Sequence, residues 1–470
     1  MKIILTCFTA IMFLLSACKV SKDIGAPTDA APVAYRNADT TTTDTASIAN
    51  IEWKHFFTDH DLQQLIDSSI ANNYDMQVAL KNIAAAQLVL KQSKLGYLPN
   101  VNLQANATIN RPSDNSLNGI SLSQFLGKSY VEDYTVSGAI SWEADIWGKI
   151  KNQKEKALAS FLQTGEARKV IQTNLVASVA SGYYNLLMLD TQVAIAKKNL
   201  LLNDSTLGII RLQYNAGEVT ALAVQQATAQ RLLAAQLIPQ LEQEIAVQEN
   251  ALSLLAAVAP AAIKRNSGIN NVQFTTRNAV GVPSALLQNR PDVKASELEL
   301  AKANANTGIA KANMYPSLTI TASGGLNAFK ASNWFNIPAS LFGAAAGSIA
   351  QPLFQRKQLK TQYELAKIDR EKRVIEFRQS VLTAVGEVSD ALVKVNKLEE
   401  QQSIAATRVD ALQQAIGNAD LLFKNGMANY LEVITAQSNV LQGELELAAL
   451  KKEQLHATVE LYRALGGGWK

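Results

Sequence analysis

Cysteine, histidine and aromatic residues are all scarce in this chain of 470 residues, which has two cysteines, three histidines and 6% aromatic residues. Both cysteines, Cys7 and Cys18, fall within the first twenty positions. A disulfide framework or a CxxC pair is therefore excluded from the rest of the chain. The histidines, His55, His60 and His456, are dispersed and no Cys or carboxylate pattern accompanies them. We therefore expect no metal site.

An excess of one charge is also missing, because 44 basic residues face 40 acidic ones. The basic residues are scattered, whereas a nucleic-acid-binding protein usually concentrates them on one face. Nucleic acid is therefore not an expected partner. The sequence contains no GxSxG, P-loop or HExxH motif, so we expect no enzymatic activity and no dissociable cofactor.

The first seventeen residues have the organisation of a signal peptide. Lys2 precedes an apolar run, residues 3–15, that is too short to span a bilayer. The following residues, Leu15-Ser16-Ala17-Cys18, resemble the lipobox of bacterial lipoproteins. We expect residues 1–17 to be removed and Cys18 to carry a covalent lipid. The alternative is a secreted protein with a leftover cysteine.

No later apolar run reaches the eighteen residues of a transmembrane helix, so any membrane-spanning element must be β. Residues 18–50 are rich in Thr, Ala, Asp, Ser and Pro and predict an extended tether without a core. From Trp53 onward the chain has folded character, with a helix capped by Asp59 and another from about Asp75 to Leu95.

Residues 100–110 alternate apolar and polar side chains over about ten positions, the length and pattern of a transmembrane β-strand. Three further strands are predicted at about 134–142, 317–326 and 343–351. A polar segment of about twenty residues joins the first two strands and predicts a long external loop. Trp142 and Trp147 are placed to join an interfacial aromatic girdle. Two soluble edge strands would give a similar pattern.

Two long helical hairpins are predicted, at 149–257 and 354–464. Both begin with a helix of about 65 residues whose apolar positions follow a 4-3 heptad spacing, which corresponds to roughly 100 Å. Glycine-containing turns at Gly217 and Gly426 reverse the chain, and we expect Pro239 to interrupt the first returning helix. Helices of this length require a coiled-coil architecture.

The order of elements occurs twice, since Gly217 and Gly426 are 209 positions apart and Pro99 and Pro316 are 217 apart. We expect a first structural repeat at 51–260 and a second at 261–470, each a helix-strand-strand-helix-helix unit.

Four strands cannot close a barrel, and an open sheet edge is not tolerated in lipid. Copies of the chain must therefore pool their strands, and three copies supply twelve. The predicted fold class is mainly α with a minor antiparallel β part. It forms a trimeric α-helical barrel joined to a 12-stranded transmembrane β-barrel, with four strands per chain.

A family resemblance is carried by the segment Leu286–Glu297, which matches an LLxRRPDIRxAE pattern through Arg290, Pro291, Asp292 and Glu297. Asn289 and Ser296 depart from the pattern. Residues 309–318, 430–437 and 462–469 match other segments of the same family. The chain resembles TolC-type outer-membrane efflux proteins, specifically the lipoprotein branch that includes NodT-like and OprM-like channels.

The resemblance implies a homotrimer in the outer membrane, anchored by lipid, with its helical part in the periplasm. It also implies a periplasmic adaptor protein and an inner-membrane pump as partners. The implied function is the passive exit duct of a tripartite efflux system. Two alternatives are the exit duct of a one-component protein secretion system and a non-transporting trimeric coiled-coil lipoprotein. The transported substrate, the particular adaptor and pump, and the open or closed resting state are not encoded in any motif.

The hairpin tips are the candidate sites for docking the adaptor. The docking candidates are Tyr214, Asn215, Gly217, Asn425, Gly426 and Tyr430. The resemblance also implies a periplasmic aperture closed by acidic residues near the tip, a position that Asp420 occupies. Arg211 lies at the equivalent position of the first repeat and is the candidate latch partner of Asp420. Arg290, Asp292 and Glu297 are expected to form structural ion pairs or caps.

Overall fold

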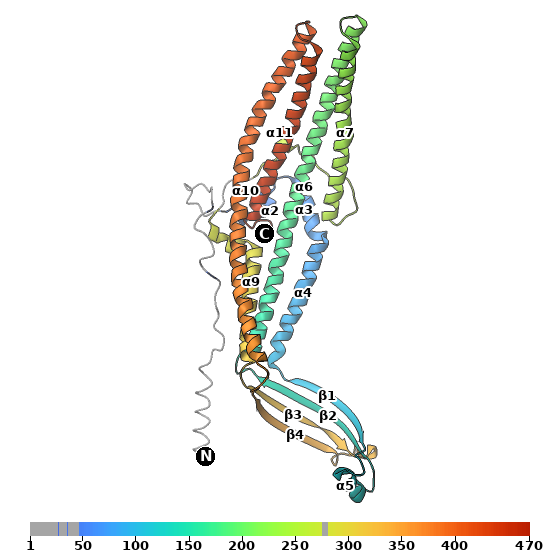
Figure 1. Cartoon of the computed structure of the whole chain (residues 1–470), viewed down its shortest axis with the longest axis vertical. Coiled ribbons are helices and arrows are strands. Elements are labelled where there is room, and N and C mark those ends of the chain that lie inside the picture. Colours follow the sequence, from blue (N-terminus) through green and yellow to red (C-terminus); the bar gives the residue numbers. More distant parts are fainter. Residues whose placement is uncertain (1–26, 28–34, 36–46, 275–280) are drawn as a thin grey trace. The chain divides into compact units, whose positions relative to one another are not determined.

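The computed structural model describes residues 47–274 and 281–470, together with Pro27 and Tyr35. The predicted signal peptide and the lipid-attachment residue Cys18 lie outside the described residues. The described chain divides into two compact units, and each unit takes residues from both halves of the sequence (Figure 1). The sheet unit contains residues 84–162 and 298–375. The helical unit contains residues 47–83, 163–274, 281–297 and 376–470, together with Pro27 and Tyr35.

The sheet unit is built on four antiparallel strands in the order β1-β2-β3-β4. Their bounds are β1 Asn100–Asn110, β2 Val131–Ala144, β3 Ser317–Ala328 and β4 Leu341–Ala350. The 3-10 turns η2 (Leu95–Tyr97) and η5 (Ala331–Asn333) flank the strands. The predicted strands are confirmed. β1 has its expected ends, β2 extends by three residues at its start and two at its end, and β3 extends by two at its end. β4 begins two residues earlier and ends one residue earlier than expected.

The connection between β1 and β2 differs from the expected loop, because it contains the helix α5 (Leu117–Leu126). The Ser116 hydroxyl caps its first turn by accepting from the Gly119 N–H, and Gly127 ends it with a positive φ of 61°. Both are ordinary helix-boundary residues, so ten residues without charge form a helix in an otherwise polar segment.

Four long helices run through both units. They are α4 (Tyr74–Lys94), α6 (Lys149–Asn215), α9 (Pro291–Ala312) and α10 (Gln358–Lys424). α6 and α10 have 67 residues each, which corresponds to roughly 100 Å. α10 begins four residues later than predicted, because Arg356 and Lys357 adopt positive φ values of 49° and 63° that no α-helix contains.

The helical unit adds the two returning helices, α7 (Ala221–Leu255) and α11 (Tyr430–Ala464), each of 35 residues. The predicted interruption at Pro239 is wrong, since Pro239 lies inside a continuous α7. Proline removes one backbone N–H, and at the exposed position of Pro239 water can bind the carbonyl group that this N–H would have bonded. The shorter elements are η1 (Ile48–Asn50), α2 (Trp53–Phe56), α3 (His60–Asn72), η3 (Ile269–Asn271), η4 (Pro283–Ala285) and α8 (Leu286–Asn289).

An aromatic cluster forms the core of the helical unit. The ring of Phe56 stacks on that of Tyr462 with 4.0 Å between centroids. The ring of Phe274 also stacks on that of Phe56, with 5.1 Å between centroids. Asp59 caps α3 as predicted, and the hydroxyl of the buried Tyr183 donates to its carboxylate. Segments from three distant parts of the sequence are thereby fixed around the middle of the long helices.

Candidate functional site

The first hairpin tip closes α6 with a Schellman turn. The Glu218 N–H donates to the Gln213 carbonyl at 2.9 Å and the Gly217 N–H donates to the Tyr214 carbonyl at 3.0 Å. Gly217 has a φ of 80°, and no atom lies within 4 Å of the position a Cβ would take. Glycine is therefore required here by the backbone angle and not by space.

The second tip repeats this turn at the end of α10. The Met427 N–H donates to the Leu422 carbonyl at 2.8 Å, and Gly426 has a φ of 72° with open space beside it. The two tips differ in the residue before the returning helix. The Asn429 side chain accepts from two backbone N–H groups of α11, whereas Thr220 makes no side-chain cap on α7.

The two tips pack against each other through one apolar cluster. Its buried members come from both hairpins: Leu207, Ile210, Ala223, Ala227, Phe423 and Val433. The Tyr430 hydroxyl adds a hydrogen bond to the Gln226 amide oxygen at 2.8 Å. Tyr430 of the second tip therefore contacts the first hairpin, whereas Tyr214 and Gly217 lie in the first turn and Gly426 lies in the second. Met427 is 75% exposed and Tyr214 47% exposed, so this region has exposed apolar side chains.

Asp420 and Arg211 do not pair within one chain. The Asp420 carboxylate instead accepts from the Lys424 ammonium at 2.6 Å, one turn along α10. Arg211 is exposed on α6. The latch between these two residues remains a proposal for contacts between copies of the chain.

A groove of about 480 Å³ lies next to the tips, between α6 and the two helices of the second hairpin. Asp420 and Lys424 line it. Its floor carries a buried polar network that sequence reasoning missed. The Gln437 amide donates to the Thr206 hydroxyl at 2.7 Å, and the Asn199 amide donates to the Gln437 carbonyl at 3.2 Å. These partners lie more than 200 positions apart in the sequence, so no local sequence pattern predicts the network.

The family segment Leu286–Glu297 has a structural role. Arg290, 5% exposed, donates to Asp292 on α9 at 2.5 and 3.0 Å, to Glu387 on α10 at 2.8 Å and to the Ala464 carbonyl on α11 at 3.1 Å. Burial disfavours ionisation of Asp292, but its hydrogen bonds with Arg290 outweigh burial, so the pKa of that carboxyl lies below its usual value. Glu297 pairs with Lys294 at 2.6 Å on the surface of α9.

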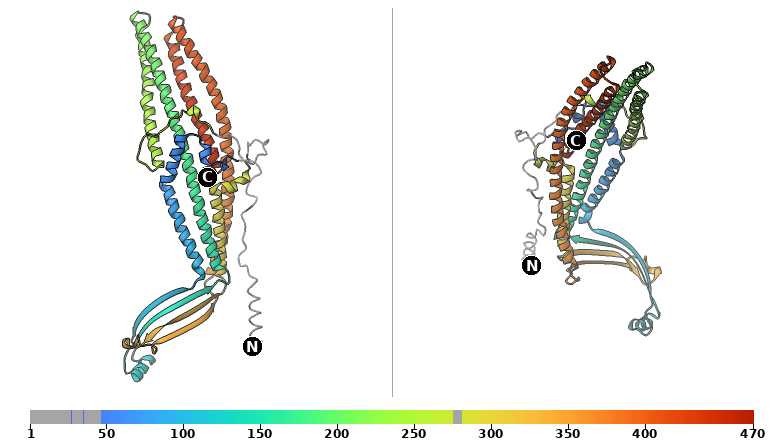
Figure 2. Two further views of the ribbon diagram at one scale, coloured as in Figure 1. Left: turned by 180° about the vertical axis from the view of Figure 1, so that it is seen from behind. Right: turned by 45° about the horizontal axis from the view of Figure 1, so that its top comes forward.

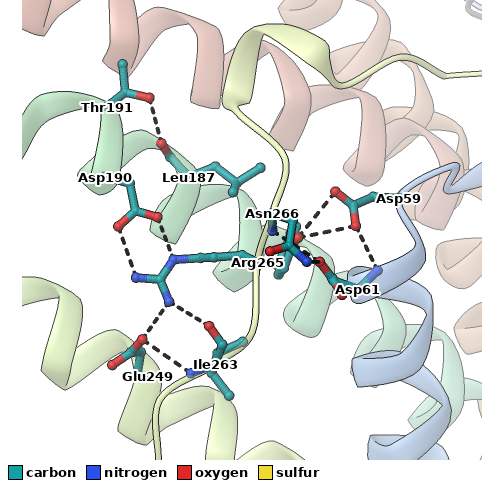
Figure 3. Close-up of polar contacts among 10 residues, drawn as sticks. Asp59, Asp61, Leu187, Asp190, Thr191, Glu249, Ile263, Arg265 and Asn266 are labelled. Carbon is teal, nitrogen blue, oxygen red and sulfur yellow. Dashed lines mark hydrogen bonds and ion pairs between the residues drawn. The ribbon is translucent and has the colours of Figure 1, made fainter. Parts of the chain in front are cut away.

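A second arginine, Arg265, holds the base of the first hairpin (Figure 3). Its guanidinium donates to both oxygens of Asp190 on α6, at 2.5 and 3.0 Å, and to Glu249 on α7 at 2.5 Å. The hydrogen bonds to Asp190 raise the pKa of Arg265, so the group stays charged. Next to it, Asp61 accepts from the Asn266 amides and pairs with Lys264 at 3.2 Å.

The four-stranded sheet has one apolar and one polar face. Register places Leu103 opposite Gly138, and Ile140 opposite both Val101 and Ala322, on the same face. The other face carries Asn102, Gln104, Asn106, Thr108, Thr135, Ser137, Thr319 and Thr321. β1 and β4 are the two edges and are exposed along their whole length, while β2 and β3 are half-buried.

Among the described residues, no helix combines the length and the apolar character needed to cross a lipid bilayer. In residues 47–274 and 281–470, no three His, Cys, Asp or Glu side chains gather as a metal site requires.

Comparison with known proteins assigns this architecture to a class. The family model described as outer membrane efflux protein matches residues 65–258 and 282–467, and the chain belongs to that family. It is the outer-membrane component of an efflux system, as its fold class and segment matches predict.

Individual proteins of known name are similar to this chain over most of its length. The chain is 30% identical to the antibiotic efflux pump outer membrane protein ArpC of Pseudomonas putida, over 97% of this chain and 94% of ArpC. It is 26% identical to the probable outer membrane lipoprotein SilC of Salmonella typhimurium, over 89% of this chain and 88% of SilC. The crystal structure of the channel protein CusC superposes with a TM-score of 0.84 at 26% identity, covering 96% of this chain and all of CusC.

Proposed function

We propose that three copies of this chain assemble into one passive exit duct, which receives substrates from an inner-membrane pump through a periplasmic adaptor. The observation that carries the proposal is the sheet with two fully exposed edges and one apolar face. In lipid an unpaired edge costs several kcal/mol per unsatisfied backbone group. Pairing β1 of one copy with β4 of the next removes every edge, and three copies give a closed barrel of twelve strands.

The faces of the sheet support the same arrangement. The apolar face suits contact with lipid, and the polar face suits a water-filled duct. The strands have 10 to 14 residues, enough to cross the membrane at a tilt. The relatives whose names describe efflux pump proteins favour efflux over protein secretion or a purely structural role.

Disulfide trapping tests the pairing of β1 with β4. Gln104→Cys would be combined with Ala344→Cys, Ala346→Cys or Ser348→Cys, all on the polar face. We expect at least one pair to yield covalent trimers, because neighbouring strands place Cα atoms within disulfide distance. Leu103→Cys with the same partners is the matched control, since it points to the opposite face. Chains that remain monomeric under every pairing would refute the assembly.

Docking of the adaptor is assigned to the exposed tips. A photo-crosslinking residue at Ala216 or Met427 should capture the adaptor in cells, because both positions are exposed beside the apolar tip cluster. The same residue at Gln236, exposed in the middle of α7, is the control and should capture far less. Crosslinks that form only between copies of this chain would contradict the docking role.

The N-terminal anchor is the lipid on Cys18. A relative named as an outer membrane lipoprotein, SilC, supports this assignment together with the lipobox-like sequence. Several acyl chains would hold the N-terminus firmly, whereas one chain gives marginal attachment. Cys18→Ala should abolish labelling with radioactive palmitate. Mass spectrometry that finds an unmodified Cys18 in membrane-purified protein would refute the anchor.

The aperture is assigned to Asp420 and Arg211 of neighbouring copies. An exposed pair contributes about 0–1 kcal/mol, so other contacts must share the closure. We expect Asp420→Ala and Arg211→Ala to raise single-channel conductance individually and to add little when combined. Lys424→Ala is the control, because it removes the partner that Asp420 has within its own chain. Unchanged conductance in Asp420→Ala, in Arg211→Ala and in the double variant would show that Asp420 does not close the aperture.

A further inference from the structure

The helix α5 lies over the polar face of the sheet. A cavity of about 590 Å³ separates the two, and its strand residues are Thr108, Asn110, Val131 and Asp133. Register pairs Thr108 with Asp133 and Asn110 with Val131, so all four belong to the polar face. Phe125 and Leu126 of α5 line the same cavity. Figures 1 and 2 show α5 at the far end of the strands, on the concave side of the curved sheet.

Local contacts fix α5 in this position. The Ser116 hydroxyl donates to the Ser113 carbonyl at 2.7 Å while it accepts from the Gly119 N–H at 3.1 Å. A Cβ on Gly119 would lie 2.1 Å from the Ser113 carbonyl oxygen, so only glycine permits this close approach. Leu122 is 8% exposed. α5 is therefore held in place by specific local contacts.

Among the described residues, three apolar side chains of α5 are largely exposed, although two of them, Phe125 and Leu126, also line the cavity. Leu117 is 81% exposed, Phe125 85% and Leu126 57%, and the helix contains no charged residue. The loop between β3 and β4 takes the opposite side, because Trp334 packs 5.3 Å from Tyr134 on the apolar face. The two loops at this end of the sheet thus cover different faces, and α5 is on the side of the polar face.

We propose that α5 is a cap that narrows the outer mouth of the duct, an inference that rests on the proposed assembly of three copies. The occupant of its apolar side is α5 of the other two copies. Because α5 lies on the concave side, beside the edge strand β1, three such helices converge across the mouth. Leu117, Phe125 and Leu126 then form an apolar ring, and narrow apolar rings obstruct water and ions by dewetting.

Thiol accessibility in intact cells tests the cap. Asn106→Cys places a reporter on the polar face below α5, and a membrane-impermeant maleimide is added from outside. Replacing both Phe125 and Leu126 by Ser should accelerate labelling by about tenfold or more, because the apolar ring is lost. Phe335→Ser, on the other loop and 67% exposed, is the matched control and should leave the rate unchanged.

A second reporter separates this inference from the proposed function. Ser332→Cys lies in the exposed β3–β4 loop and should react rapidly from outside in every background. If it does not react, the sheet does not reach the cell surface, and the duct and the cap both fail. If it reacts while Asn106→Cys labels equally fast with and without the two serines, the cap is refuted and the duct stands. Equal acceleration by Phe335→Ser would also overturn the cap.

Discussion

The two hairpins have the same backbone but are held together in different ways. α6 and α10 have equal lengths, as do α7 and α11, and both tips turn through a glycine with positive φ. The first hairpin is clamped near its base by Arg265, which bridges α6 and α7. The second is clamped by the more deeply buried Arg290 and has a capped tip at Asn429. The two turns share one backbone conformation, whereas the side chains that clamp the two hairpins differ.

The largest effect is expected from Arg290→Ala. The substitution leaves Asp292 and Glu387 without their shared cation, and breaking a buried ion pair costs about 3–5 kcal/mol. Denaturant unfolding would measure the loss. Because the pKa of folded Asp292 is depressed, its contribution is present above the unfolded pKa and is lost as pH falls through the folded value. The variant should therefore also lose part of its acid sensitivity. A loss below about 1 kcal/mol would show that the clamp is dispensable.

Arg265→Ala should cost less, roughly 2–3 kcal/mol, because Asp190 is 40% exposed and water can replace the guanidinium there. Its neighbour Lys264 is a matched control, since it pairs with Asp61 but is 72% exposed. Lys264→Ala should cost no more than about 1 kcal/mol. Equal losses for the two variants would contradict a specific clamp at the base of the first hairpin.

Gly217→Ala and Gly426→Ala should each destabilise by about 1–2 kcal/mol, since an L-residue in the left-handed region pays that amount. The two costs should be equal, because neither site has an atom within 4 Å of the new Cβ. Gly208→Ala, in the open interior of α6, is the control and should stabilise by about 0.5–1 kcal/mol. Thermal unfolding of the three variants measures the difference, and unequal costs at the tips would break the equivalence of the turns.

The smallest effect is expected from Ala257→Gly, at the end of the first returning helix. Ala257 and Gly466 occupy equivalent positions and have positive φ values of 52° and 93°. Ala257→Gly relieves the strain of alanine and should stabilise by less than about 1 kcal/mol. Gly466→Ala should instead destabilise, because its Cβ would lie 2.5 Å from the Asn289 carbonyl oxygen. A destabilised Ala257→Gly variant, seen as a lower Tm, would contradict the account of this turn.

The long helices, the strands and the tips were predictable because each depends on local spacing. Heptad seams, two-residue alternation and turns that contain Asn and Gly are all recognisable within one short stretch of sequence. The Arg265 clamp was not predictable, since its partners Asp190 and Glu249 lie 75 and 16 positions away. Ser116 and Gly127 did mark the ends of α5, but serines interspersed with a glycine concealed the helix between them. Pro239 shows that one lost hydrogen bond does not end a helix packed along its length.

The duct itself is tested most directly by single-channel conductance of the purified protein in planar bilayers. The account predicts discrete conductance steps from preparations whose mass is that of a trimer, because only pooled strands close a pore. The steps should disappear when assembly is prevented by charged substitutions on β1, such as Leu103→Lys on the apolar face. Trimers that insert into the bilayer without any conductance, or conductance from monomers, would contradict the account.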